Sequence, residues 1–218
     1  MHTVLISKLD KNRPSFFAMH FAIALAENFR VALVNYDLSN DDLQSFMQKR
    51  QALCAKYDTS LPTPIYFSGR QNILEDLKRD FQFIILDGAD LSQAKDCDTL
   101  LTIVTANKDV HCLTDQKSDC ATKIWQARQQ RALLRQKPFD WVVLPVGPQN
   151  SKELFKKAPL AGYRPAPELV EESACIKGLQ TGLTVLDKNI PCFIPFFKSE
   201  DFFARRNLKS IIEFVLKK

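Results

Sequence analysis

The sequence predicts a doubly wound α/β fold, in which helices cover both faces of a mostly parallel sheet. Short apolar segments alternate with longer helical segments along the chain. The apolar segments are nearly continuous rather than alternating with polar residues, which is typical of strands that are buried on both faces. The 218 residues contain no internal repeat or low-complexity stretch, so we expect a single domain over residues 1–218.

Six segments rich in β-branched or aromatic residues are the predicted strands: Val4–Ser7, Val31–Tyr36, Pro64–Phe67, Phe83–Leu86, Leu100–Thr105 and Trp141–Leu144. The predicted helices lie between and after them: Ser15–Asn28, Asp41–Lys56, Asn72–Asp80, Gln116–Lys137 and Glu200–Leu216. The Pro-containing stretch Ala158–Glu168 is predicted to be a loop on the domain. Ligands of such sheets bind beyond the carboxyl ends of the strands, so functional residues are expected there.

Composition excludes several classes of protein. The net charge of +5 permits an acidic partner without requiring one. The six cysteines form no CxxC pair, and no histidine lies at ligand spacing from them, which favours reduced cytosolic thiols over disulfides or a metal site. The apolar run at the start of the chain is too short for a signal peptide, because Lys8 and Asp10 soon interrupt it. No apolar run in the sequence reaches membrane-spanning length. We therefore expect a cytoplasmic protein with no membrane association.

Two of the predicted strands end in acidic or amide residues. The fourth, in the sequence FIILDGAD, ends in Asp87, and the second runs into Asn35-Tyr36-Asp37. In a P-loop enzyme, an apolar strand of this kind ends in the Asp that holds Mg²⁺ through water. A buried strand can also end in an Asp that caps the next element. Both interpretations of Asp87 stay open.

The loop after the first strand, KLDKNRPS, contains no glycine, and the first glycine of the chain is Gly69. A phosphate-cradling loop points successive backbone N–H groups inward, which requires left-handed dihedrals that glycine adopts freely. Pro14 also removes an N–H group from the helix start, where it would face an anion. Pro14 is well placed in the first turn of a helix, so the loop is equally a capped strand–helix turn. Three cations, Lys8, Lys11 and Arg13, could still bind phosphate through their side chains.

The basic helix Gln116–Lys137 has one acid, Asp119, against six cations. Arg128, Arg131 and Arg135 are spaced i, i+3 and i+7, which predicts that they share one face. Such a stripe is commonly a solvated outer face. It could instead contact DNA phosphates, a sister subunit or an acidic protein. Both interpretations stay open.

Four stretches carry a resemblance to a known family. They are the loop, helix and strand that contain HFAIALA and VALVNYDLS; SFMQKRQALCAKYDTSLPTP; IWQARQQRALLRQKPFDWVVL; and GYRPAPELVEESACIKGLQTGLTVLD. With these stretches the chain resembles the MinD/ParA family of deviant P-loop ATPases. The QRAL…DWVVL and GLTVLD blocks are similar to its MipZ branch, which positions the division plane.

The resemblance implies a P-loop NTPase-like fold and a cytoplasmic homodimer around two ATP molecules with Mg²⁺. It also implies nonspecific DNA binding, recruitment by the partitioning protein ParB and inhibition of the division protein FtsZ. Residue by residue, Ser15 takes the Mg²⁺-binding hydroxyl position and Asp87 the second Mg²⁺ position. Lys8 matches the signature lysine if the loop is one residue longer than usual, and Asn35 stands at the position of the water-orienting carboxylate. The nucleotide-binding set is then Lys8, Lys11, Arg13, Ser15 and Asp37.

The resemblance assigns the chain to the ATP hydrolases, whereas the loop sequence argues against turnover. The favoured hypothesis is a pseudo-ATPase that regulates division or chromosome position with weakened or lost ATP binding. The alternative is an active ATP-dependent dimerisation switch that uses Lys8, Lys11 and Ser15 in an atypical loop. A third hypothesis is a scaffold unrelated to division.

Overall fold

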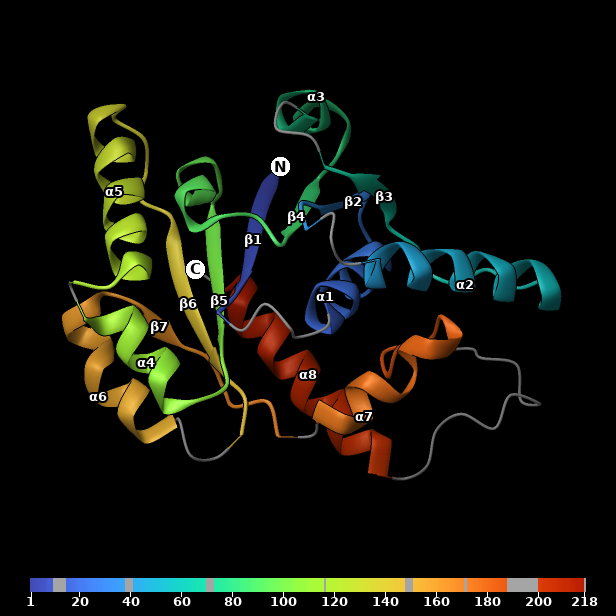
Figure 1. The fold of residues 1–218 in the computed structure, drawn as a ribbon. Helices are drawn as coiled ribbons and strands as arrows, with labels where there is room; N and C mark the ends of the chain where they lie inside the picture. The colour runs from blue at the N-terminus through green and yellow to red at the C-terminus, as the bar shows by residue number, and fades with distance from the viewer. Residues whose placement is uncertain are drawn as a thin grey trace.

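The computed structural model describes residues 1–9, 15–37, 41–69, 73–115, 117–147, 151–170, 172–187 and 200–217. In these ranges, seven strands form one sheet in the order β3-β2-β4-β1-β5-β6-β7 (Figure 1). Every neighbouring pair is parallel, which confirms the predicted doubly wound fold. The strands are β1 His2–Lys8, β2 Val31–Asn35, β3 Ile65–Ser68, β4 Phe83–Asp87, β5 Thr99–Val104, β6 Asp140–Pro145 and β7 Arg164–Pro165.

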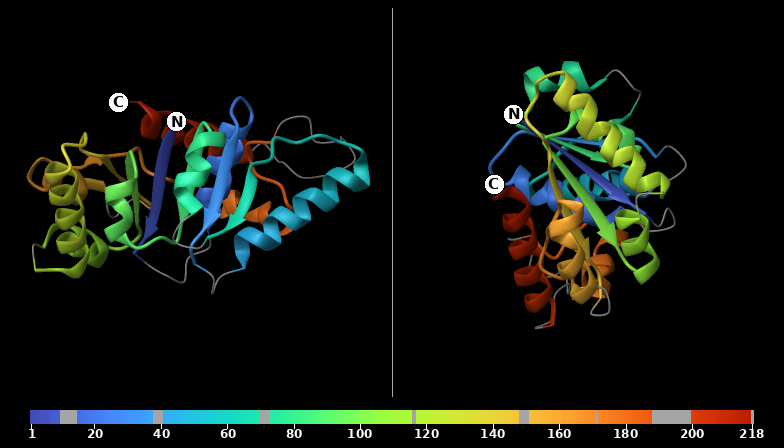
Figure 2. Two further views of the ribbon diagram at one scale, coloured as in Figure 1. Left: turned by 90° about the horizontal axis from the view of Figure 1, so that it is seen from above. Right: turned by 90° about the vertical axis from the view of Figure 1, so that its left-hand side faces the viewer.

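The helices connect these strands and cover both faces of the sheet. They are α1 Phe16–Ala26, α2 Asp42–Tyr57, α3 Ile73–Asp80, α4 Asn107–Thr114, α5 Asp119–Leu133, α6 Ser151–Ala161, α7 Glu172–Lys177 and α8 Glu200–Leu216, with two short 3₁₀ helices, η1 Leu91–Asp96 and η2 Leu179–Thr181. One core lies between the sheet and α1, α2, α7 and α8. The second core lies under α3, η1, α4, α5 and α6. Figure 2 shows α8 on one side of the sheet and α3 and α5 on the other.

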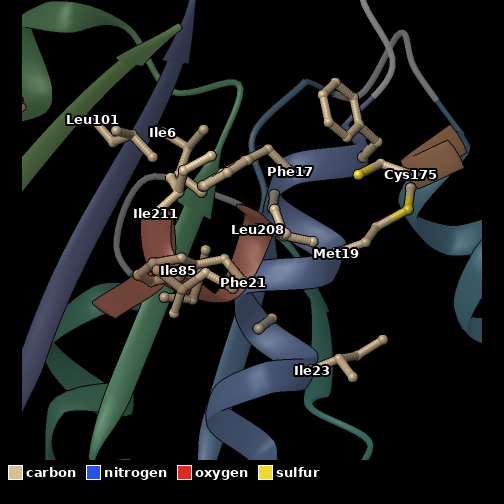
Figure 3. Close-up of a cluster of buried hydrophobic side chains, with 14 of the residues drawn as sticks. Ile6, Phe17, Met19, Phe21, Ile23, Ile85, Leu101, Cys175, Leu208 and Ile211 are labelled. Atoms are coloured by element: carbon tan, nitrogen blue, oxygen red, sulfur yellow. The ribbon is translucent and has the colours of Figure 1, made fainter. Parts of the chain in front are cut away.

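Helix α1 has no polar face. Its residues from Phe16 to Ile23 are all buried, because the sheet covers one side of the helix and other helices cover the opposite side. Figure 3 shows Phe17 of α1 directed towards the strand residue Ile6 and Phe21 beside the strand residue Ile85, with Leu208 of α8 nearby. A helix enclosed in this way is held firmly, and the end of the helix at Ser15 is therefore fixed at the carboxyl edge of the sheet.

The stretch predicted as a loop, Ala158–Glu168, is different in the structure. It contains the end of α6 and the seventh strand, β7, which extends the sheet beyond β6. The sequence gives no apolar run there, because β7 is only two residues long and lies at the edge. Arg164 holds the strand in place through an ion pair with Asp140 and a hydrogen bond from its guanidinium to the Lys217 carbonyl (3.0 Å). Pro165 is tolerated because an edge strand has no further neighbour that needs its missing N–H group.

The basic helix is shorter than predicted. Helix α5 begins after Ser118, whose hydroxyl accepts a hydrogen bond from the Ala121 amide (3.1 Å) and caps the first turn. It ends at Leu133, and Arg135 follows with a φ of 55°. A left-handed residue cannot continue an α-helix, so the predicted extension to Lys137 is wrong.

Candidate functional site

The carboxyl edge of the central strands brings four predicted site residues together. Strands β2, β4 and β1 are neighbours, and Asp87 pairs in register with Asn35 on one side and Ile6 on the other. Asp37 follows β2, and Ser15 precedes α1. This arrangement follows from the parallel sheet, since all its strands end at the same edge.

Ser15 and Asp87 are in direct contact. The Ser15 hydroxyl donates a hydrogen bond to Asp87 Oδ2, and both residues are buried. A hydrogen bond to an ionised carboxylate contributes about 1.5–3 kcal/mol. The Asp87 carboxylate thus lies against the residue that opens α1, where the helix dipole favours a negative charge. One hydroxyl and one carboxylate are also the protein oxygens with which Mg²⁺ is held beside nucleotide phosphates, so this pair fits Mg²⁺ in its chemistry.

Asn35 has a structural role in this edge. Its side-chain Oδ1 accepts a hydrogen bond from the Asp37 amide (3.0 Å), which turns the chain as it leaves β2. The Tyr36 amide donates to the Asp87 carbonyl (2.8 Å), so the two strand ends are joined through their backbones. Gly88 has a φ of 72°, and a Cβ atom there would lie 2.6 Å from Asp37 Cβ. The segment 35–37 is therefore packed tightly against 87–88.

The cations predicted for the nucleotide are not all within the described part of the chain. Lys8 is the last residue of β1, and its backbone pairs with Ile103 of β5. The Lys8 side chain, together with Lys11 and Arg13 in residues 10–14, lies outside what the structure describes.

The three arginines of the basic segment do not form a common outer face. The Arg131 guanidinium is buried and donates to the carbonyls of Lys95, Cys97 and Lys137 at 2.7–2.8 Å. Arg128 lies over the Trp141 ring at 5.2 Å and donates to the Gly162 carbonyl (2.6 Å). Burial lowers the pKa of Arg128. Arg135 is exposed beyond the helix end. The predicted single stripe is wrong, because each side chain points to a different environment.

Sequence reasoning did not find the buried ion pair of Arg50 and Asp187. Both guanidinium ends donate to the carboxylate, at 2.9 and 2.6 Å, and neither side chain is exposed. Arg50 also donates to the carbonyls of Gly182 (3.0 Å) and Pro62 (2.7 Å). The amide of Thr184 donates to Asp187 Oδ2 (2.7 Å). The pair joins residues that are 137 positions apart in the chain, so spacing carried no signal for it.

Gly182 allows the backbone of this segment to approach α2. It has a φ of 81°, and a Cβ atom there would lie 2.4 Å from the Arg50 backbone nitrogen. No other residue fits this approach without moving the backbone. The loop 182–187 and α2 are thus joined by close contact as well as by charge.

Two further features, a metal-binding group and a membrane-spanning helix, are absent from the described residues. Among the residues that the structure describes, no three His, Cys, Asp or Glu side chains gather into a metal-binding group. Within those same ranges, no helix has both the length and the apolar character needed to cross a membrane.

Residues 11–216 match the model of a family described as ATPase MipZ. The chain belongs to the MipZ ATPase family. Two of the stretches that resemble this family, SFMQKRQALCAKYDTSLPTP and the block that ends in GLTVLD, meet in space at the Arg50–Asp187 pair. No curated protein sequence matches the chain.

Several solved structures share the fold of this chain at low sequence identity. The apo structure of McdA from Cyanothece superposes with a TM-score of 0.59 at 15% identity, over 100% of both chains. An ATP complex of a Cyanothece McdA variant superposes with a TM-score of 0.61 at 14% sequence identity, over 100% of this chain and 97% of the other. A protein described as a putative plasmid partition protein from Borrelia burgdorferi B31, bound to AMPPNP, superposes with a TM-score of 0.55 at 12% sequence identity. The match covers 99% of this chain and 98% of the other. At these identities the likeness shows the P-loop NTPase-like fold.

Proposed function

We propose that this MipZ family member regulates the position of division or of the chromosome with a weakened or lost nucleotide site. The observation that carries the proposal is the loop KLDKNRPS before α1, which contains no glycine and has Pro14, without an amide hydrogen, next to Ser15. The hydrogen bond from Ser15 to Asp87 does not itself exclude Mg²⁺, because the hydroxyl keeps its lone pairs and Asp87 would act through water.

A second feature of the same edge supports the proposal. Asn35 stands where a carboxylate would orient water, and its amide oxygen accepts from the Asp37 backbone. An amide cannot take up the charge of a carboxylate, so hydrolysis would be slow even with ATP bound. The active dimerisation switch is the alternative candidate, and the contact between Ser15 and Asp87 supports it, since a hydroxyl and a carboxylate are chemically suited to Mg²⁺.

Calorimetric titration with Mg-ATP tests the nucleotide site. The natural chain is expected to give no measurable binding at micromolar concentrations. Replacing residues 9–14 with Gly-Gly-Val-Gly-Lys restores a glycine loop of ordinary length between Lys8 and Ser15. This variant is expected to gain at least a hundredfold in affinity, because its amides can then reach the phosphates. Adding Asp87→Ala to it should remove the gain.

Two outcomes would contradict the proposal. Micromolar binding by the natural chain that Asp87→Ala abolishes would favour the active switch. A glycine-loop variant that folds and yet does not bind would show that the loop is not the cause of the weakness. Circular dichroism spectra of all variants control for folding.

The partners follow from the family and are also part of the proposal. We infer a cytoplasmic homodimer that contacts FtsZ or ParB, with nonspecific DNA as a further candidate. Pull-down with purified FtsZ and ParB is expected to capture at least one of them equally well with and without Mg-ATP. Capture that requires Mg-ATP would favour the switch, whereas capture of neither protein would favour a scaffold unrelated to division.

A further inference from the structure

An open groove of about 1430 Å³ lies on the sheet face opposite α8, between α4, α5 and α6. It is separate from the carboxyl-edge residues Ser15, Asn35 and Asp87, none of which lines it. Small-molecule sites commonly enclose about 300–1,000 Å³ and bury most of the ligand. An open groove larger than this range suits a segment of another macromolecule.

Two large apolar side chains line the groove and are exposed. Trp125 of α5 is 59% exposed, and Leu160 of α6 is 92% exposed. Single exposed apolar residues are normal on protein surfaces, but two from different helices that line one groove form a candidate anchor site. Burying such side chains against a partner would favour binding, because apolar surface is removed from water.

Several contacts hold Arg128 in place at the base of the groove. Arg128 is held over the rings of Trp141 and Phe139, at 5.2 and 5.7 Å, and donates to the carbonyls of Ala161 (3.2 Å) and Gly162 (2.6 Å). These contacts connect α5 to the end of α6. Tryptophan and arginine are the residue types that most often dominate binding energy at interfaces, and a pre-ordered base reduces the entropy that binding costs.

The charge around the groove is positive. Lys117, Arg128 and Lys157 line it, whereas Asp115 is the one acid among its described lining residues. Helix α6, which forms one wall, carries Lys152 and Lys156 in exposed positions. Glu153 pairs with Lys157 (2.9 Å) and partly offsets that charge. The balance favours a partner with carboxylates beside its apolar residues.

We propose that this groove binds an acidic amphipathic helix of a partner protein. The apolar face of the helix covers Trp125 and Leu160, and its flanking carboxylates face Lys117 and Lys157. Grooves between helices bind amphipathic helices through anchors spaced i, i+4 and i+7. A second copy of this chain is disfavoured as the occupant, since a symmetric contact would place the same lysines opposite each other. Nucleic acid is disfavoured because phosphates would leave the aliphatic Leu160 uncovered.

A phage-displayed library of random 16-residue peptides, selected on the full chain, tests this proposal. Enriched peptides are expected to carry net negative charge and apolar residues at helical spacing. Trp125→Ala and Leu160→Ala should each weaken a selected synthetic peptide at least tenfold, and Lys157→Glu should weaken it similarly. Calorimetric titration of the selected peptide measures binding for every variant, because Trp125 and Trp141 both line the groove and Trp125 is itself replaced in one variant.

Phe155→Ala is the matched control. Phe155 is 55% exposed on the same helix α6 but does not line the groove. This variant should bind the selected peptide within twofold of the natural chain. No enrichment, enrichment of basic peptides, or equal losses for Phe155→Ala and Trp125→Ala would overturn the proposal. So would dissociation of a homodimer by Trp125→Ala in analytical ultracentrifugation, or competition for the groove by a DNA duplex or single strand.

Discussion

Arg50→Ala is expected to lower the free energy of unfolding by about 3–5 kcal/mol, since removing one partner of a buried ion pair leaves the other charge uncompensated. Within the described structure, the Asp187 carboxylate would keep its hydrogen bonds from Thr184. The carbonyls of Pro62 and Gly182 would lose their donor as well. Urea denaturation of the two proteins at pH 7 measures the difference.

The matched control is an exposed pair. Lys123 lies 3.0 Å from both Asp90 and Asp119, and the three side chains are 32%, 53% and 78% exposed. Lys123→Ala removes a cation in the same way and should cost less than about 1 kcal/mol, because water and salt screen the interaction. Arg50→Lys keeps the charge but cannot reach two carbonyls and both carboxylate oxygens together. Its cost in unfolding free energy should therefore lie between those of Arg50→Ala and Lys123→Ala. A cost for Arg50→Ala as small as that for Lys123→Ala would show that the buried pair does not join α2 to residues 182–187.

Acidification from pH 6.5 to pH 4 is expected to lower the stability of the fold by about 3 kcal/mol through His20 alone. Burial lowers the pKa of His20 from 6.5 to about 4, although the hydrogen bond to the Phe16 carbonyl and the charge of Asp187 act in the opposite direction. In this pH range the unfolded chain binds a proton that the folded chain does not. The His20 contribution is therefore complete above about pH 6.5 and is lost as the pH falls towards 4.

The geometry of His20 gives the physical reason. Its Nδ1 donates to the Phe16 carbonyl (2.7 Å), while Nε2 is buried with no hydrogen-bond partner in the described structure. A protonated ring would therefore bring an unpaired N–H group and a positive charge into the apolar core. His20→Leu removes the titration, so its unfolding free energy should fall less steeply than that of the natural chain between pH 6.5 and 4. Parallel pH profiles of the two proteins would refute the assignment.

The sequence could predict the strands because their signal is local. The apolar runs of β1, β2, β4, β5 and β6 are buried on both faces, and their positions agree with the predicted segments within a residue or two. The carboxyl edge was predictable for the same reason, since the parallel strands β2 and β4 end in Asn35 and Asp87 and place these two residues together. Helix α6 and strand β7 could not be predicted, because Pro159 and the Pro-rich residues around it are typical of a loop.

The roles of individual charged residues depended on distant parts of the chain. Arg131 and Arg128 follow a helical spacing that indicates an outer stripe, yet one binds the carbonyls around η1 and the other covers Trp141. Arg50 gives no sign in the sequence that it is buried, because its partner is Asp187 at the other end of the chain.

By itself, the sequence determined the positions of the buried strands, the sheet edge at which ligands are expected, and the absence of glycine from the loop there. These properties depend on neighbouring residues and on backbone dihedrals, which are local. Tertiary structure alone decided that Ser15 and Asp87 bond to each other, that Arg50 and Asp187 are paired, and that Trp125 and Leu160 line one groove. Each of these contacts joins elements separated in the sequence, and only the packing of those elements on the sheet brings them within reach.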